Sequence, residues 1–183
     1  MQPWSYAGRW GLITGASAGL GAVFADRLAA RGMHLVLTAR RQDRLEALAE
    51  RLEADYGIQT VIVPADLLRE GEPERVWLEA SAGRDIDLLI NNAGIGAQGR
   101  FIDVPLQRHV DLLRVNIEAV VILAHLALAH MRPRRTGAIV NLSSIAAFQP
   151  VPLLAVYAAS KAFVLSFSEA LWVENRDHGI RVL

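Results

Sequence analysis

The chain has 183 residues, 52% of them hydrophobic and 21% charged, which is enough for one domain with a buried core and too few for two ordinary ones. The 19 basic and 19 acidic residues balance, so the charge gives no sign of a nucleic-acid or anionic-membrane partner. The lack of cysteine excludes disulfides, thiolate metal sites and cysteine nucleophiles.

Apolar runs rich in β-branched residues alternate along the chain with longer amphipathic segments. The strand-like runs are Trp10–Thr14, Met33–Thr38, Thr60–Pro64, Ile86–Ile90, Ala138–Leu142 and Ile180–Leu183. The helix-like segments are Gly19–Arg31, Arg41–Tyr56, Glu70–Ala82, Pro105–Met131, which is one helix or two end to end, and Ala155–Asp177. Apolar strands joined by long helices form parallel sheets covered on both faces. We therefore expect one α/β domain over residues 1–183, a doubly wound parallel sheet in three αβα layers.

Two stretches bear on location. The segment before the first strand is short and is broken by Pro3 and Gly8, so no secretory peptide fits there and the cytoplasm is the expected location. The longest uncharged stretch, Ala138–Ser160, contains Asn141, several other polar residues and two prolines. We expect this stretch to fold into the domain and not to span a membrane.

A glycine-rich turn follows the first strand and opens the first helix, as Thr14-Gly-Ala-Ser-Ala-Gly-Leu-Gly21. Glycines at such a place permit a tight turn, let backbone N–H groups approach a pyrophosphate and let the helix pack close to the strand. The turn therefore predicts a phosphate site. A glycine-rich turn without a ligand is the alternative that the pattern leaves open.

Tyr157 and Lys161 are four residues apart in a predicted helix, so their side chains share one face. Lys161 is the single lysine of a chain that otherwise uses arginine, which suggests chemistry that arginine does not perform. At about 4 Å and an effective dielectric constant of ~20, an ammonium would stabilise a phenolate by about 4 kcal/mol, or roughly three pKa units. The pair predicts a tyrosine general acid or base. The alternative is a tyrosine that packs on the stem of an exposed lysine.

These motifs together are similar to those of the short-chain dehydrogenase/reductase family. The matching features, in chain order, are Gly15-x-x-x-Gly19-x-Gly21, Asp66, Asn91-Asn92-Ala93-Gly94, Asn116, Ser144 and Tyr157-x-x-x-Lys161. The resemblance extends from about Gly8 to the end of the chain. It implies a Rossmann-like fold and an oxidoreductase that transfers a hydride between a nicotinamide and a carbonyl or secondary alcohol.

The end of the second predicted strand, Ala39-Arg40-Arg41, favours NADP(H) over NAD(H). In Rossmann-type domains a carboxylate at this place binds the ribose hydroxyls, whereas an arginine accommodates a 2′-phosphate. Here no carboxylate is present, and we place the main weight on Arg40. For Arg41, a solvated start of the next helix is also open.

The resemblance implies further contacts on the adenosine side of the cofactor. Asp66 would accept from the adenine amino group, the Leu67 N–H would donate beside it, and Ser17 would lie next to the 2′-phosphate. Asp66 also fits a turn or a helix cap. The expected cofactor-binding residues are Gly15, Ser17, Gly19, Leu20, Gly21, Arg40, Arg41, Asp66, Leu67, Asn92, Ala93, Gly94, Tyr157 and Lys161.

The expected catalytic residues are Asn116, Ser144, Tyr157 and Lys161, with no metal. By resemblance, Ser144 would hydrogen-bond the substrate oxygen, and Asn116 would kink its helix and hold a water against the Lys161 ammonium. A structural cap is the alternative for Asn116. Apolar residues after the fourth and fifth strands would line a pocket for a small-molecule carbonyl or alcohol.

The resemblance also implies segments that this sequence does not contain after Leu183, so we expect a shortened form of a longer family member with weak turnover. A non-catalytic dinucleotide-binding module, or an inactive fragment, is therefore the alternative function. The apolar helix 155–177 suggests self-association as a homodimer or homotetramer.

Overall fold

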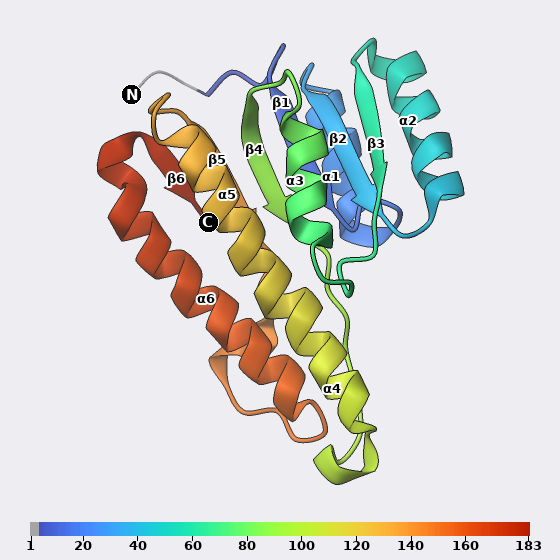
Figure 1. The fold of residues 1–183 in the computed structure, drawn as a ribbon, viewed down its shortest axis with the longest axis vertical. Coiled ribbons are helices and arrows are strands. Elements are labelled where there is room, and N and C mark those ends of the chain that lie inside the picture. The colour runs from blue at the N-terminus through green and yellow to red at the C-terminus, as the bar shows by residue number, and fades with distance from the viewer. Residues whose placement is uncertain (1–3) are drawn as a thin grey trace.

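The structure is a computed structural model that describes residues 4–183. Six parallel strands form one sheet in the order β3-β2-β1-β4-β5-β6 (Figure 1). The strands are β1 (Trp10–Thr14), β2 (His34–Ala39), β3 (Thr60–Pro64), β4 (Ile86–Asn91), β5 (Gly137–Asn141) and β6 (Ile180–Val182). The helices are α1 (Gly19–Ala29), α2 (Gln42–Tyr56), α3 (Glu72–Ser81), α4 (Leu106–Leu113), α5 (Ala119–Met131) and α6 (Ala155–Asn175). The expected doubly wound α/β domain is confirmed.

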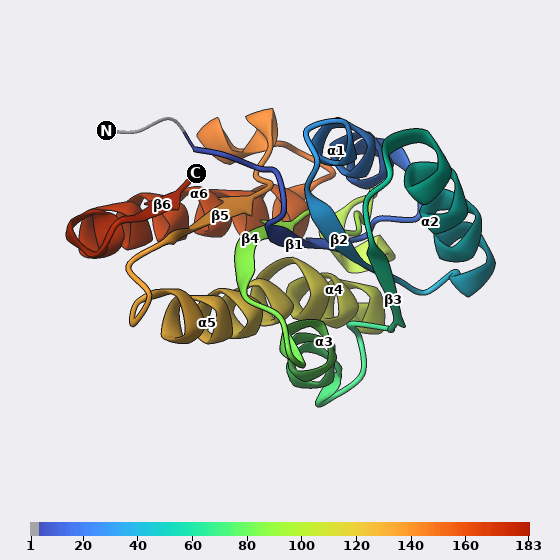
Figure 2. The ribbon, with the colours of Figure 1, turned by 90° about the horizontal axis from the view of Figure 1, so that it is seen from above.

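The helices cover the two faces of the sheet in separate layers (Figure 2). On one face, α1 and α2 bury Leu28 and Leu45 against Leu35 and Leu37 of β2. On the other face, α3, α5 and α6 pack on a second core. This division follows from right-handed crossovers, because the chain runs outward from β1 in both directions.

Six predicted helix boundaries differ from the structure by one or two residues, among them Pro105, Ala82 and Asp177, and three of the six have a clear local reason. The third helix begins at Glu72 and not at Glu70, because Gly71 adopts a left-handed φ of 77° as the N-cap and Pro73 occupies the first turn. The second helix begins after Arg41, whose backbone is extended. The first helix ends at Ala29, ahead of Gly32 with its φ of 78°.

The long segment predicted over 105–131 is α4 and α5 joined without a break by a π-helical turn at Arg114–Glu118. A π turn inserts an extra residue into the helical ladder and turns the side chains at that point. Within the described residues, Leu106–Met131 is the one helical stretch long and apolar enough to cross a membrane by length and composition. It packs against β4, α3 and α6 as a helix of the core does.

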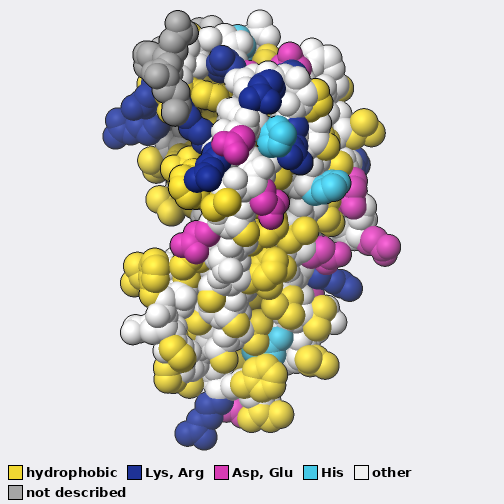
Figure 3. All heavy atoms as spheres, turned by 90° about the vertical axis from the view of Figure 1, so that its left-hand side faces the viewer, with side chains coloured by type: hydrophobic (Ala, Val, Ile, Leu, Met, Phe, Trp, Pro, Cys, Tyr) yellow, Lys and Arg dark blue, Asp and Glu magenta, His cyan; other side chains and the backbone are white. Residues whose placement is uncertain are grey.

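Hydrophobic side chains dominate the lower part of the molecule on the side of α6, whereas charged side chains gather at the upper end (Figure 3). One stripe of exposed positions on α6 consists of small or apolar residues together with Ser166, and the exposed Glu169 and Glu174 flank it. The small or apolar residues are Ala155, Ala159, Phe163, Ala170 and Val173, and we call them the outer α6 face.

Candidate active site

The glycine turn lies at the carboxyl end of β1, beside the end of β4. Gly15 and Gly19 have left-handed φ values of 67° and 57°. A Cβ on Gly21 would collide with the carbonyl oxygen of Gly15 and lie 2.6 Å from Asn92 Nδ2. Asn92 fixes the turn, because its Nδ2 donates to Thr14 O at 2.8 Å and to Gly15 O at 3.2 Å. The turn therefore needs glycine for both conformation and space.

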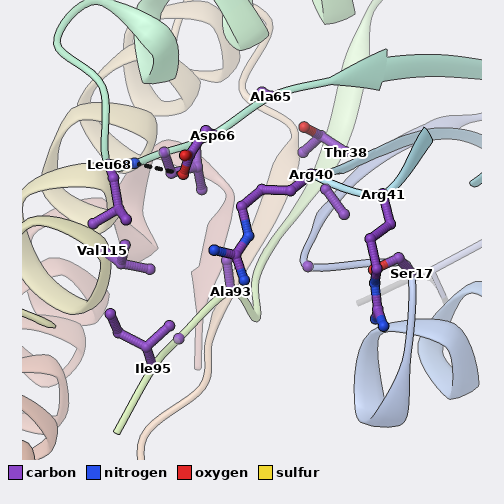
Figure 4. Close-up of a pocket in the computed structure, with 14 residues that line it drawn as sticks. Ser17, Thr38, Arg40, Arg41, Ala65, Asp66, Leu68, Ala93, Ile95 and Val115 are labelled. Atoms are coloured by element: carbon purple, nitrogen blue, oxygen red, sulfur yellow. Dashed lines mark hydrogen bonds between the residues drawn. The ribbon is translucent and has the colours of Figure 1, made fainter. Parts of the chain in front are cut away.

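A cleft opens where β1, β2, β3 and β4 end (Figure 4). The predicted cofactor residues that line it are Gly15, Ser17, Arg40, Arg41, Asp66, Leu67, Ala93 and Gly94. The other six predicted cofactor residues lie outside its lining. Asn92 supports the turn, Gly19, Leu20 and Gly21 form the first turn of α1, and Tyr157 and Lys161 lie on α6. Thr38, Ala65, Leu68, Ile95 and Val115 complete the lining together with Ala39.

The two arginines after β2 point to different parts of this cleft (Figure 4). Arg41 folds onto the glycine turn, where its Nε and Nη2 donate to Ser17 Oγ at 3.3 and 3.1 Å. The guanidinium of Arg40 extends across the cleft and has no hydrogen bond or ion pair with any described residue. Arg41 is thus more than a solvated helix start, and the cation nearest to Ser17 is Arg41 and not Arg40.

Asp66 follows β3 at the far side of the cleft. Its Oδ1 accepts from the Leu68 N–H at 3.3 Å, which is the geometry of a turn-stabilising aspartate. Its backbone N–H donates to Glu72 Oε2 at 3.4 Å. The turn role predicted as an alternative is therefore present, and it leaves the second carboxylate oxygen of Asp66 open to a ligand.

Tyr157 and Lys161 lie on one face of α6, as their spacing requires. Lys161 is only 6% exposed, so Tyr157 does not pack on an exposed lysine. The Lys161 ammonium donates to Leu142 O at 2.7 Å and lies 5.9 Å from the centroid of the Tyr157 ring. Burial lowers the pKa of Lys161, because desolvation disfavours its charged form.

Asn116 sits in the π turn and is fully buried. Its Oδ1 accepts from the Ile95 N–H at 2.9 Å, and its Nδ2 donates to Ile95 O at 3.0 Å and to Ser160 Oγ at 3.1 Å. Asn116 therefore clamps the loop after β4 to α6. A Cβ on Gly94 would lie 3.4 Å from Asn116 Oδ1 and 3.6 Å from Lys161 Nζ, which places that loop directly beside the ammonium.

Ser144 caps the short 3₁₀ turn Ile145–Phe148, because its Oγ accepts from the Ala146 N–H at 3.2 Å. Among the described residues it makes no hydrogen bond to Tyr157 or Lys161. The neighbouring Ser143 bonds the backbone of α6, because its Oγ donates to Lys161 O at 2.8 Å. The side chains of Ile145 and Phe148 are 89% and 76% exposed, so this turn offers an apolar surface beside the site.

Sequence reasoning missed two supporting residues. Thr14 Oγ1 accepts from the N–H groups of Asn92 and Ala93 at 3.0 and 2.9 Å and so holds the loop after β4. Ser160 Oγ accepts a hydrogen bond from Asn116 Nδ2 and donates one to the Tyr157 carbonyl, so it links the two residues. A polar residue ending an otherwise apolar strand was the available signal for Thr14, whereas nothing in the local pattern pointed to Ser160. The described residues hold no cluster of metal-ligating side chains.

Comparisons with known proteins agree with this geometry. A family model described as short chain dehydrogenase matches residues 9–183. The 17-beta-hydroxysteroid dehydrogenase type 3 of Mus musculus is 40% identical over 94% of this chain and 57% of its own length. The inactive hydroxysteroid dehydrogenase-like protein 1 of Rattus norvegicus is 36% identical over 96% of this chain and 54% of its own length.

A solved structure, a short-chain dehydrogenase from Sphingobium yanoikuyae in complex with NADPH, superposes with a TM-score of 0.91. It is 39% identical, and the match covers 95% of this chain and 68% of that one. The chain spans little more than half the length of the curated relatives that it matches.

Proposed function

The chain belongs to the short-chain dehydrogenase family, and on this premise we propose that it binds NADP(H) and interconverts a carbonyl and a secondary alcohol. The observation that carries the proposal is the buried Lys161 beside Tyr157, at the sheet edge where the glycine turn and the Arg41–Ser17 pair also lie. A buried lysine with a single backbone acceptor has unused donors, which a ligand in the site would satisfy.

The residues of the cleft fit a dinucleotide phosphate. Gly15 and Gly21 let the turn pack closely against Asn92, which holds the start of α1 at the edge of the cleft, where a pyrophosphate would bind. The guanidinium of Arg41 and the Ser17 hydroxyl form a donor pair for a 2′-phosphate, and no carboxylate ends β2 to repel it. The solved Sphingobium relative carries NADPH, which supports the same choice here.

The cofactor supplies a hydride donor or acceptor at the nicotinamide C4. Tyr157 gives its hydroxyl proton to the substrate oxygen during reduction and removes a proton during oxidation. Leu142 O orients the Lys161 ammonium, which stabilises the phenolate and, with the cofactor bound, would donate to its ribose. Ser144 holds the substrate oxygen once its hydroxyl turns from Ala146. Asn116 keeps the Ile95 loop against the site.

The substrate class that the site supports is a lipophilic ketone or alcohol. Ile145 and Phe148 expose apolar side chains next to Ser144. The mouse relative is named for a hydroxysteroid, which is a substrate of this kind.

A non-catalytic or inactive dinucleotide-binding module is the second candidate, because the rat relative is named inactive and the matches cover little more than half of the relatives. Titration of NADPH fluorescence, followed by turnover against a carbonyl panel, separates the two. Binding with turnover that Tyr157→Phe abolishes supports the enzyme. Binding without turnover supports the module, and no binding of NADPH contradicts both.

A further inference from the structure

Thr38 is buried at the carboxyl end of β2 and lines the cleft (Figure 4). Its neighbours in register are Thr14 on β1 and Val63 on β3. Side chains alternate along a strand, so Thr38 faces the same side as Val36, which packs in the core beneath α3 and α5. The hydroxyl of Thr38 therefore faces the side of the cleft formed by Leu68 and Val115.

This hydroxyl has no hydrogen-bond partner among the described residues, although the residue is 1% exposed. The neighbouring Thr14, equally buried, uses its hydroxyl on the backbone of Ile90, Asn92 and Ala93. A buried hydroxyl without a partner is costly and uncommon in native proteins. Because Thr38 lines a cleft, a ligand in that cleft is the natural source of the missing partner.

The surroundings of Thr38 indicate which part of a ligand it meets. The phosphate-binding donors, the Arg41 guanidinium and the Ser17 hydroxyl, lie below Thr38 in Figure 4, whereas the Thr38 hydroxyl points away from them, toward Ala65 and Asp66. Ala65 lies beside Thr38, and the side of the cleft that the hydroxyl faces is lined by Leu68 and Val115, with the Asp66 carboxylate between them (Figure 4). An apolar slot edged by hydrogen-bonding groups suits a flat heteroaromatic base and not a phosphate.

We propose that the Thr38 hydroxyl hydrogen-bonds the adenine ring of the bound dinucleotide and so contributes to recognition of the base. The proposal rests on the proposed NADP(H) function and deepens it. Adenine offers ring nitrogens that accept and an amino group that donates, and a hydroxyl satisfies either.

The test compares Thr38→Val, which replaces the hydroxyl with a methyl group, with Thr38→Ser, which keeps it. The matched control is Thr136→Val, in the half-buried turn before β5, far from the cleft. Binding of NADPH, 2′,5′-ADP, 5′-AMP and 5′-UMP is titrated, and the melting temperature of the ligand-free protein is measured. If Thr38→Val does not fold, Thr38→Ala against Thr38→Ser gives the same comparison.

We expect Thr38→Val to lower the affinity for NADPH, 2′,5′-ADP and 5′-AMP by about 3- to 10-fold, which corresponds to the net contribution of one hydrogen bond. Its preference for 5′-AMP over 5′-UMP falls, whereas Thr38→Ser and Thr136→Val bind as the wild type does. The ligand-free melting temperature of Thr38→Val stays level or rises, because an unsatisfied buried hydroxyl has been removed.

Three results would overturn the proposal. They are unchanged nucleotide affinity in Thr38→Val, a loss confined to the 2′-phosphorylated ligands, and an equal loss for 5′-AMP and 5′-UMP. Each leaves the NADP(H) function standing as long as the wild type binds NADPH. A wild type that binds neither NADPH nor 2′,5′-ADP contradicts that function itself.

Discussion

At the scale of single residues, the two arginines after β2 have different positions in the cleft and different expected roles. Arg41 lies on Ser17, while Arg40 spans the cleft. We expect wild-type protein to bind NADPH at least about tenfold more tightly than NADH, since charge-assisted bonds to a phosphate contribute about 1.5–3 kcal/mol each. Arg41→Ala removes most of this preference without weakening NADH. Arg40→Asp reverses it, because a carboxylate repels the 2′-phosphate and binds ribose hydroxyls.

Both cofactors are titrated at one ionic strength, because phosphate contacts are screened by salt. Arg44→Ala, which removes an exposed charge from α2 outside the cleft, is the control and leaves both affinities unchanged. Equal affinities of the wild type for NADPH and NADH would contradict the prediction.

The burial of Lys161 predicts how the stability of the protein depends on pH. Burial lowers its pKa from the usual 10.5, so between the lowered pKa and 10.5 the unfolded chain binds more protons than the folded one. The contribution of Lys161 to the unfolding free energy therefore rises as pH increases through this window. Urea unfolding of wild type and Lys161→Met at several pH values up to 10 measures the difference. A difference independent of pH would show that the folded-state pKa is not lowered.

At the scale of elements, the glycine turn and α1 form one tightly packed unit. Gly21→Ala forces a Cβ into the Gly15 carbonyl, so we expect it to lower the unfolding free energy by about 1–3 kcal/mol and to weaken NADPH more than tenfold. Gly19 has open space around it, so Gly19→Ala causes no collision. Its cost to the unfolding free energy is the backbone strain of a left-handed alanine, about 1–2 kcal/mol. Urea unfolding and NADPH titration of both variants check this.

The two substitutions add the same methyl group two residues apart in one helix turn. Their comparison therefore separates steric exclusion from backbone strain. If Gly19→Ala weakened NADPH as much as Gly21→Ala does, close packing between the turn and α1 would not be the reason for glycine at position 21.

At the scale of the whole molecule, the outer α6 face contains no charged residue, although Glu169 and Glu174 flank it, and α6 lies on the apolar side of the protein (Figure 3). Small residues around Phe163 let a second helix approach closely, so we predict that two copies of the chain pair through α6. Sedimentation velocity is expected to show a dimer that Phe163→Glu dissociates. Leu78→Glu, at a 71% exposed position of α3, is the matched control and keeps the dimer. A wild type that is monomeric at micromolar concentration would refute the prediction.

Much of this protein follows from local pattern. Buried parallel strands such as Leu35–Leu37 are apolar throughout. In the helices between them, apolar residues recur about every 3.6 positions, so the order of strands and helices was predictable. The glycine turn and the Tyr157–Lys161 pair were predictable for the same reason, because each lies within one helical turn or one loop.

The partners of these residues depended on the tertiary structure. Arg41 reaches Ser17 because β1 and β2 end side by side, and Asn116 reaches Ile95 because the π turn lies under the β4 loop. The position of β2 between β1 and β3 in the sheet buries Thr38 with an unpartnered hydroxyl. A sequence determines which side chains alternate inward along each strand. Strand order and helix docking decide which of them meet, because those contacts join residues 20 to 80 positions apart in a register that no local window contains.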